Sequence, residues 1–302
     1  MRLWNDYHTP TSIEEALQLL AHYQGRARLV AGGTDLLVEI REGRHAPQDA
    51  LVDVTHIPEM TTHHQEADGT IWLGAAVTHS HIVQSALLTQ AATCLVESCG
   101  VVGGPQVRNV GTIGGNVAHA LPAGDGTTSL VALDATARVV LDGQEQWVPI
   151  EQMFKGPGQS LLDPTRDILI GFRFKASGTH EASAFKRIMR PQGVALPILG
   201  CAVWVRLTDG QIADARISIA PIGPTPARAT VVEEALRGQP ANPASIEQAI
   251  AVANEALHPR TSKYRATAPY RQEMIAVLLR RTLPLAIDRA RTGQAIPEGI
   301  GA

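Results

Sequence analysis

The chain has 302 residues, of which 44% are hydrophobic and 18% charged, and its formal net charge is −3 at pH 7. This is the composition of an ordinary globular protein long enough for two domains, and its slight acidity argues against a nucleic-acid surface as the main partner. The longest apolar runs, such as Gly200–Val205, are far too short to span a bilayer, and no apolar signal segment opens the sequence. We therefore expect a cytoplasmic protein with no membrane span and no nucleic-acid partner.

The first residues have the pattern of a small parallel βαβ unit that follows an opening turn. Thr11–Glu15 carries the hydroxyl cap and acidic residues typical of a helix start, and the helix is expected to end near Gly25. Residues 28–31 predict a strand, residues 36–40 a short helix and residues 51–54 a second strand. A strand, a tight turn, a helix and a strand within so short a stretch favour parallel pairing.

A second unit of strands and helices is predicted from Thr70 onward. It begins with a strand at residues 71–75, after which Thr78 is expected to cap a helix. A buried helix that carries Cys94 and Cys99 follows. The later predicted elements are a helix at residues 126–133, a strand at residues 137–141 that turns at Asp142-Gly143, and a strand at residues 168–174.

The pattern changes after residues 177–179, which we interpret as a linker. Two extended segments then flank Thr208-Asp209-Gly210, which is a strong signal for a β-hairpin. Proline-rich residues 221–226 end this hairpin, and helical periodicity follows. The extended segments are residues 198–207 and 212–220, and the helical patterns are residues 230–236, 246–257 and 271–291.

Metal chemistry has little support in the sequence. The three cysteines, at positions 94, 99 and 201, form no C-x-x-C pair and no Cys/His quartet, so we expect buried free thiols and no metal site. His63-His64 and His79-x-His81 lack a matching cysteine or carboxylate pattern, and we expect these histidines at the surface or in loops.

Two glycine-rich segments lie about eighty residues apart: Ala31-Gly32-Gly33-Thr34-Asp35 and Gly111-Thr112-Ile113-Gly114-Gly115-Asn116. Paired glycines beside a hydroxyl residue suit a turn whose N–H groups converge on an anion, because glycine tolerates positive φ and has no Cβ. Neither segment is a P-loop, and neither fits the G-x-G-x-x-G dinucleotide fingerprint. Together they predict two turns that grip the two ends of a long, doubly charged cofactor.

These motifs resemble those of the FAD-binding medium subunit of the molybdenum hydroxylases, the group that contains carbon monoxide dehydrogenase and xanthine dehydrogenase. The matching segments are residues 31–37 and 107–116. Asp125 also fits the family pattern, as do Tyr264-Arg265 and Tyr270-Arg271 ahead of the terminal helix. The resemblance covers nearly the whole chain in the same order.

The resemblance implies an α+β fold with two domains. Residues 1–176 would form a vanillyl-alcohol-oxidase-type FAD-binding domain of two α/β subdomains, at about residues 1–57 and 58–176. Residues 177–302 would form a C-terminal domain with a small antiparallel sheet and helices. The implied cofactor is FAD, bound non-covalently.

The resemblance also implies an oxidoreductase role without a catalytic residue for the organic substrate in this chain. Electrons would pass from a molybdopterin large subunit to an iron–sulfur small subunit, then to the flavin and on to an external acceptor. The expected assembly is a dimer of heterotrimers. The substrate pocket would lie in another chain.

The resemblance assigns FAD binding to both glycine-rich segments and to two further residues. N–H groups of the first segment and the Thr34 hydroxyl would hold the pyrophosphate, and the second segment would hold phosphate and the ribityl side. Asp125 would accept hydrogen bonds from ribityl or ribose hydroxyls, and Lys186 would place a cation near the flavin. The predicted cofactor residues are Ala31, Gly32, Gly33, Thr34, Asp35, Gly111, Thr112, Ile113, Gly114, Gly115, Asn116, Asp125 and Lys186.

Each of these residues also has a purely structural interpretation. The first segment could be an ordinary strand-to-helix turn and the second a bulged turn. A carboxylate repels pyrophosphate, so we expect Asp35 to point away and cap the helix that begins at Leu36. Asp125 could equally cap a helix that begins at Gly126, and Lys186 could belong to a solvated basic strand.

The stretch after the basic residues departs from the family pattern. Carbon monoxide dehydrogenase-like relatives place a tyrosine against the flavin ring here, whereas residues 190–196 contain no aromatic side chain. The sequence therefore leaves open the flavin exposure, the acceptor (NAD, a quinone or oxygen), the organic substrate and the stoichiometry. It also leaves open whether Lys186 or His119, which follows the second glycine-rich segment, contacts the flavin.

Two rival functions are weighed against the electron-transfer subunit. A flavin-free scaffold would keep the fold and only bridge two partners, but both glycine-rich segments are intact. A stand-alone flavin oxidase would need a substrate-binding base, and the sequence offers no obvious one. We therefore favour the FAD-carrying electron-transfer subunit.

Overall fold

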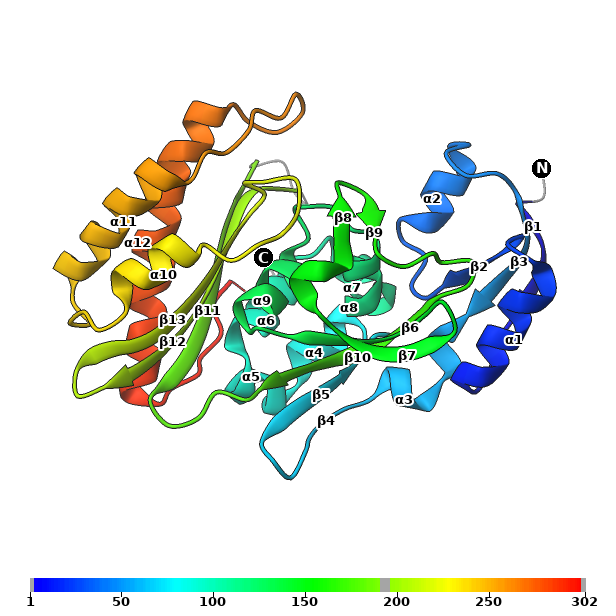
Figure 1. Ribbon diagram of the computed structural model, residues 1–302, viewed down its shortest axis with the longest axis horizontal. Helices are drawn as coiled ribbons and strands as arrows, with labels where there is room; N and C mark the ends of the chain where they lie inside the picture. The colour runs from blue at the N-terminus through cyan, green and yellow to red at the C-terminus, as the bar shows by residue number, and fades with distance from the viewer. Residues whose placement is uncertain (1–2, 191–195, 300–302) are drawn as a thin grey trace.

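The computed structural model describes residues 3–190 and 196–299. Three regions lie side by side in Figure 1: a small N-terminal sheet with its helices, a central sheet backed by helices, and a C-terminal sheet flanked by long helices. The chain therefore mixes helices and sheets, as the α+β class requires.

The N-terminal region is a parallel three-stranded sheet in the order β1-β3-β2. The parallel pairing of β2 with β3 confirms the predicted βαβ unit. The turn predicted before Thr11 is wrong, because these residues form strand β1 at the sheet edge. Three of its five residues are exposed, so the sequence shows no apolar alternation there. The elements are β1 (Trp4–His8), α1 (Ile13–Tyr23), β2 (Ala27–Val30), α2 (Leu36–Arg41) and β3 (Gln48–Asp53).

The predicted start of α1 is confirmed as a reciprocal cap. The Ser12 hydroxyl accepts a hydrogen bond from the backbone N–H of Glu15 at 3.1 Å. The Glu15 carboxylate accepts one from the backbone N–H of Thr11 at 2.8 Å. The helix ends at Gln24 and Gly25, both of which have positive φ. This cap places the chain for the short strand that leads into the first glycine-rich turn.

The central region is an antiparallel sheet in the order β4-β5-β10-β6-β7, with helices on one face. Helix α6 is buried on all sides, and its two cysteines are free and fully enclosed, as predicted. The strands are β4 (His63–Gln65), β5 (Thr70–Gly74), β6 (Thr136–Leu141), β7 (Gln144–Pro149) and β10 (Ile168–Lys175). The helices are α3 (Pro58–Thr61), α4 (His79–Gln84), α5 (Ala86–Ala91), α6 (Thr93–Gly100), α7 (Pro105–Val110), α8 (Ile113–Ala118) and α9 (Asp125–Ala132).

Short elements lie in the connections between the longer strands and helices. They are the 3₁₀ helices η1 (Val54–His56) and η2 (Ile150–Met153) and the small hairpin of β8 (Phe154–Gly156) and β9 (Gln159–Ser160).

The C-terminal region is an antiparallel sheet in the order β11-β12-β13. The hairpin between β12 and β13 turns at Asp209 and Gly210, both with positive φ, which confirms the Asp-Gly signal. The three predicted helices are also confirmed. The elements are β11 (Glu181–Met189), β12 (Pro197–Thr208), β13 (Gln211–Ala220), α10 (Thr230–Leu236), α11 (Pro243–Ala256) and α12 (Ala268–Thr292).

The C-terminal sheet packs on both faces. Phe185 and Trp204 join the core that fills the central region, whereas Ala184 and Val203 join a second core beneath α10, α11 and α12. Successive side chains of a strand point to opposite faces. Each position on β11 therefore faces either the central helices or α12.

A buried ion pair ties the central helices to the C-terminal region. Glu97 on α6 and Arg289 on α12 are 1% and 3% exposed, with 2.6 Å between Oε1 and an Nη atom. Glu97 also accepts hydrogen bonds from the backbone N–H groups of Phe185 (2.7 Å) and Glu298 (2.8 Å). Because all of these hydrogen bonds converge on one buried carboxylate, they fix the relative positions of α6, α12, β11 and the segment that follows α12.

Among the described residues, no helix is long and apolar enough to cross a membrane. Nor do three or more His, Cys, Asp or Glu side chains gather anywhere in residues 3–190 and 196–299 in a way that could hold a metal ion.

Candidate functional site

The two glycine-rich turns lie directly against each other. A Cβ atom built on Gly32 would stand 2.0 Å from the carbonyl oxygen of Val110 and 2.8 Å from Cα of Gly111. A Cβ built on Gly111 would in turn stand 3.8 Å from the Thr34 hydroxyl oxygen. Only a residue without a side chain permits the first contact, because the atoms in the way are backbone. The fold therefore brings together two segments that are far apart in the sequence.

The first turn joins β2 to α2, so its strand-to-helix interpretation is confirmed. Gly33 has φ +66°, a conformation that glycine adopts without strain. No hydrogen bond within the described chain engages the backbone N–H groups of residues 32–35 or the Thr34 hydroxyl. These unused donors cluster in one turn, which suits an anionic ligand.

Asp35 occupies the N-cap position of α2, but its side chain makes no capping hydrogen bond. The expected side-chain cap is therefore wrong. Its backbone has φ −98° and ψ −49°, which is helical. A capping side chain needs an extended backbone at that position in order to reach the N–H groups ahead of it.

The second turn joins two short helices, α7 and α8, so its interpretation as a bulged turn is wrong. Its N–H groups are almost all used inside the protein. Gly114 donates to the carbonyl oxygen of Ala75 at 2.8 Å, and Ile113 donates to that of Val77 at 3.0 Å. Gly115 donates to the Thr112 hydroxyl at 3.0 Å, which caps α8. These hydrogen bonds anchor the second turn to the segment after β5, and the first turn packs against it.

Helices α8 and α9 are joined by the side chain of Asn116. Its Oδ1 accepts hydrogen bonds from the backbone N–H of Thr127 at 3.1 Å and from the Thr127 hydroxyl at 3.2 Å. A Cβ on Gly126 would stand 2.7 Å from Cδ1 of Ile113, so glycine again permits a close approach. The second turn and the start of α9 therefore form one packed unit.

Asp125 is the first residue of α9, and Gly124 holds the N-cap position. The capping interpretation of Asp125 is therefore wrong. Its carboxylate is buried and accepts a hydrogen bond from Arg187 on β11 at 2.7 Å. Burial raises the pKa of Asp125 to about 6, while the Arg187 charge acts in the opposite direction. The side chain thus reaches across to the C-terminal region instead of to its own helix.

Lys186 and Arg187 point to opposite faces of β11. Arg187 lies on the face toward α9, whereas the Lys186 ammonium pairs with Glu298 near the C-terminus. The structure therefore does not bring Lys186 to the glycine-rich turns, and its flavin contact stays a prediction. Arg187 was not among the predicted site residues. The signal was available in the alternation of the strand, which places Phe185 and Arg187 on the same face.

A small cavity of about 210 Å³ lies next to the Tyr264-Arg265 motif that precedes the terminal helix. Tyr264 and Arg265 line it together with Arg190, Leu196 and Ile198. Asp125 acts electrostatically on Arg265, whose pKa is lowered by burial. Most of the stretch in which we expected no aromatic residue near the flavin, residues 191–195, lies outside the described residues.

Comparison with known proteins decides the family. Residues 3–174 match the model described as "FAD binding domain in molybdopterin dehydrogenase", and residues 183–286 match the "CO dehydrogenase flavoprotein C-terminal domain". The chain belongs to the molybdopterin dehydrogenase FAD-binding family. FAD is accordingly its cofactor, and the chain is a component of an oxidoreductase.

Relatives match along nearly their whole length. The carbon monoxide dehydrogenase medium chain of Hydrogenophaga pseudoflava is 29% identical over 94% of this chain and 97% of its own. The 6-hydroxypseudooxynicotine dehydrogenase complex subunit alpha of Paenarthrobacter nicotinovorans is 30% identical over 95% of each. The solved carbon monoxide dehydrogenase from H. pseudoflava superposes with a TM-score of 0.87 at 28% identity, over 94% of this chain and 98% of that chain.

The residues present fit FAD. The first turn offers unused N–H donors for a diphosphate, and the glycine at position 32 keeps the two turns in contact. A carboxylate and a guanidinium, Asp125 and Arg187, stand at the start of α9 and can hold hydroxyl groups and a polar ring edge. The donor set therefore matches the chemistry of a flavin dinucleotide.

The four histidines expected at the surface or in loops are not all exposed, and His63 is half-buried in strand β4. His64 and His81 are exposed, as predicted, but His79 is 2% exposed. That prediction was wrong because His79 is the first residue of α4, where it packs against Gly111. His119, at the end of α8, lies 3.9 Å from the Glu39 carboxylate on α2. This pair lies between the two helices that follow the glycine-rich turns.

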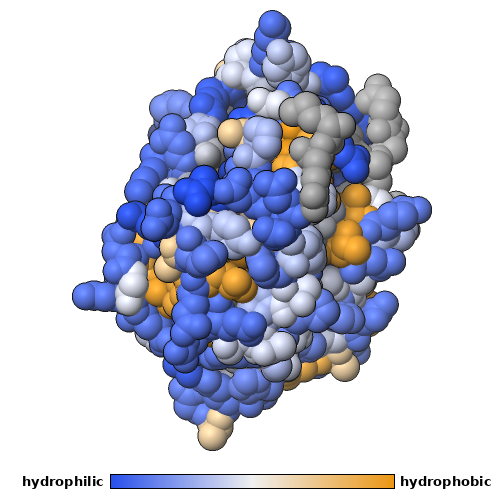
Figure 2. All heavy atoms as spheres, turned by 90° about the vertical axis from the view of Figure 1, so that its right-hand side faces the viewer, coloured by the Kyte–Doolittle hydropathy of each residue, from blue (hydrophilic) through white to orange (hydrophobic). Residues whose placement is uncertain are grey.

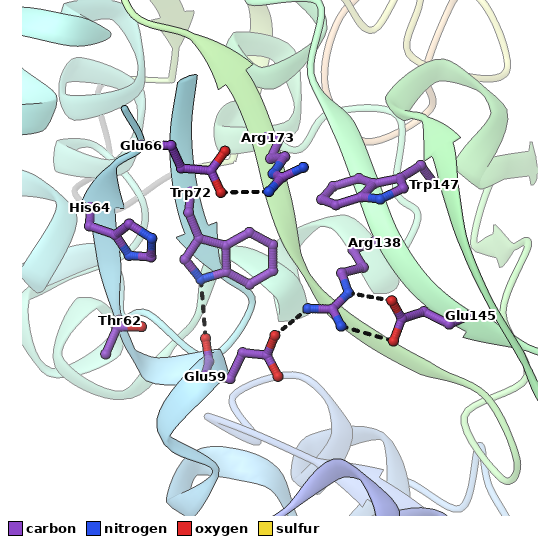
Figure 3. A pocket seen from close by; sticks show the side chains of 9 residues that line it. All are labelled: Glu59, Thr62, His64, Glu66, Trp72, Arg138, Glu145, Trp147 and Arg173. Carbon is purple, nitrogen blue, oxygen red and sulfur yellow. Dashed lines mark hydrogen bonds and ion pairs between the residues drawn. The ribbon is translucent and has the colours of Figure 1, made fainter. Parts of the chain in front are cut away.

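A larger cavity of about 410 Å³ lies on the central sheet (Figure 3), and neither the glycine-rich turns nor any other predicted cofactor residue lines it. Its charged side chains pair with each other: Arg138 binds Glu145 through two hydrogen bonds of 2.8 and 2.9 Å. The Arg173 guanidinium lies 4.7 Å from the centre of the Trp147 ring. We interpret this surface as a cross-strand ladder that stabilises the sheet.

Proposed function

We propose that this chain is the FAD-carrying electron-transfer subunit of a cytoplasmic molybdenum hydroxylase. It accepts electrons from an iron–sulfur small subunit, which receives them from a molybdopterin large subunit, and passes them to an external acceptor. The full assembly is a dimer of heterotrimers. The observation that carries this proposal is the contact between the two glycine-rich turns in a chain of this family. At this contact, the backbone N–H groups of the first turn have no acceptor within the described chain.

The domain organisation is part of the proposal. Residues 1–176 form a vanillyl-alcohol-oxidase-type domain with subdomains at about residues 1–57 and 58–176, and residues 177–302 form the C-terminal domain. The second hydrophobic core lies wholly within residues 182–290, which supports this division, although Phe185, Ala202 and Trp204 extend the first core onto the C-terminal sheet. The two FAD turns come from different subdomains, so the diphosphate lies at the junction between them.

Each part of the site has a distinct task in holding FAD, whose flavin supplies two-electron storage with one-electron exchange. The N–H groups of residues 32–35 and the Thr34 hydroxyl bind the diphosphate. The second turn sets the position of the first. Asp125 accepts hydrogen bonds from ribityl or ribose hydroxyls and is held in place by Arg187. Lys186 and His119 stay candidates for a contact with the flavin.

The iron–sulfur subunit docks beside the flavin, because electron transfer requires the ring edge and the cluster to be close. Exposed apolar side chains near the site support this. Val110 and Leu121 flank the second turn, and Leu196 and Tyr264 at the small cavity are 65% and 75% exposed. At the N-terminal end of the molecule, apolar side chains form several separate patches among hydrophilic ones (Figure 2). Large stable interfaces are partly apolar.

Co-expression with its genomic neighbours tests the proposal. We expect the chain to copurify with a ferredoxin-like subunit and a molybdopterin subunit, to release FAD and not FMN on denaturation, and to crosslink to the ferredoxin-like subunit beside Tyr264. A stable FAD-bound monomer that ignores both neighbours would contradict the electron-transfer role. A protein that stays colourless after incubation with FAD would support the scaffold, and steady turnover of an organic substrate by the chain alone would support the stand-alone oxidase.

A further inference from the structure

His79 is a buried imidazole without a hydrogen bond. The residue is 2% exposed, and its Nδ1 is enclosed without a partner. Within the described residues, neither ring nitrogen takes part in a hydrogen bond. Buried polar groups normally find a partner, because one left without it loses its hydrogen bonds to water. Because Nδ1 is enclosed, only Nε2 could gain a partner from a molecule outside the described chain.

The ring lies where the two FAD turns meet. Its Cδ2 atom would be 3.4 Å from a Cβ built on Gly111, and the Thr34 hydroxyl oxygen is 3.8 Å from the same point. The His79 backbone N–H donates to the Gly111 carbonyl oxygen at 3.0 Å, so the residue is fixed to the second turn. Because Cδ2 is bonded to Nε2, the Nε2 side of the ring is the side nearer to the turns.

The surroundings keep the imidazole neutral and place one positive charge near it. Burial and the charge of Arg108 lower the pKa of His79 to about 4. Arg108 itself is 9% exposed, donates to the carbonyl oxygens of Val102 and Gly103, and has no carboxylate partner among the described residues. A buried guanidinium without a counter-ion is costly, and an anion at the junction would neutralise it.

The enclosed Nδ1 suggests which tautomer is present. A neutral imidazole carries its proton on one nitrogen and a lone pair on the other. An acceptor left without a partner is the more common condition in protein interiors, whereas an orphaned N–H is rare. The lone pair therefore belongs on Nδ1 and the proton on Nε2, on the side toward the turns.

We propose that His79 is a further FAD-binding residue, whose Nε2–H donates a hydrogen bond to the diphosphate at the junction of the two turns. The proposal rests on the placement of the diphosphate at these turns given above. His79 lies against the second turn, so its Nε2–H would reach the diphosphate from the side opposite to the N–H groups of the first turn. The second turn thereby gains a donor that its own backbone lacks.

The test measures FAD binding to the full chain after removal of its flavin, by quenching of flavin fluorescence. His79→Gln places an amide nitrogen near the position of Nε2, His79→Asn places one near Nδ1, and His79→Phe keeps a flat ring with no nitrogen. We expect His79→Phe and His79→Asn to raise the dissociation constant roughly 10- to 100-fold, and His79→Gln to stay within about fivefold of wild type. His81→Gln on the exposed side of α4 is the matched control and should bind like wild type.

Urea unfolding of the flavin-free variants separates binding from folding. We expect His79→Gln to unfold like wild type. Wild-type affinity in folded His79→Phe would overturn the proposal, and so would rescue by asparagine instead of glutamine. Failure of the wild-type chain to bind FAD would contradict the placement of the cofactor itself, which is a different result.

Discussion

The two glycine-rich turns have similar sequences and opposite uses of their backbone. In the first, the N–H groups of residues 32–35 have no acceptor within the described chain. In the second, residues 113–115 donate to Ala75, to Val77 and to the Thr112 hydroxyl. This difference is the basis for our proposal that the first turn binds the diphosphate and the second supports the first. Glycine serves both purposes, because a missing Cβ admits a ligand in one turn and a neighbouring backbone in the other.

The largest effect is expected from Gly32→Ala, which separates the two turns. The new Cβ would stand 2.0 Å from the Val110 carbonyl oxygen, and no flexible side chain can move to relieve the clash. We expect a loss of about 1–3 kcal/mol of unfolding free energy. FAD binding should weaken roughly 100-fold or more, because several hydrogen bonds to the diphosphate lose their geometry.

The measurements for Gly32→Ala are urea unfolding and flavin content after gel filtration. Gly223→Ala is the matched control, since its Cβ would make only an ordinary contact at 3.7 Å. Full flavin content in Gly32→Ala would show that the contact between the turns is not needed for binding.

The threonines of the two turns separate binding from support. Thr34→Val removes a hydroxyl that has no partner within the described chain, so we expect about tenfold weaker FAD binding and unchanged unfolding of the flavin-free chain. Thr112→Val removes the cap of α8, so we expect a loss of about 1 kcal/mol of unfolding free energy. Fluorescence titration and urea unfolding of both variants check this, and the reverse pattern would refute the division of labour.

A smaller effect concerns the carboxylate beside the second turn. The pKa of Asp125 is raised by burial from 3.8 to about 6. Below pH 6 the side chain is mostly protonated and accepts hydrogen bonds from FAD hydroxyls less well, and above pH 6 it is mostly ionised. We therefore expect FAD affinity to rise about threefold to tenfold from pH 5 to pH 7. Asp125→Asn should flatten this profile, and an unchanged slope in that variant would assign the titration to another group.

Much of the fold followed from local signals. The cap at Ser12, the Asp209-Gly210 hairpin and the helix at residues 230–236 were all predicted, because each depends on residues close in sequence. Strand β1 was missed because it lies at the sheet edge and buries little. Strand β1 is defined by its pairing with β3, whose paired residues are 44 positions away in the sequence, and no local pattern indicates that pairing.

The FAD contacts of the site residues stay predictions, and the structure adds how these residues pack against each other. The glycines at positions 32 and 111 were identified, but their mutual approach depends on how the two regions pack. Asp35 was assigned a cap from its residue type, although the backbone angles at that position prevent it. Arg187 and His79 were missed because neither has a local signal. Arg187 matters because its face of β11 meets Asp125, and His79 because the first residue of α4 is buried in the folded chain.

Amide hydrogen exchange of the full chain, measured with and without FAD, tests the contrast between the turns most directly. Without FAD, we expect fast exchange at residues 32–35, whose N–H groups have no acceptor within the described chain, and slow exchange at residues 113–115, whose N–H groups are bonded inside the protein. Adding FAD should slow exchange at residues 32–35 and leave residues 113–115 nearly unchanged. Equal slowing in both turns, or no change at residues 32–35, would contradict the assignment of binding to the first turn and support to the second.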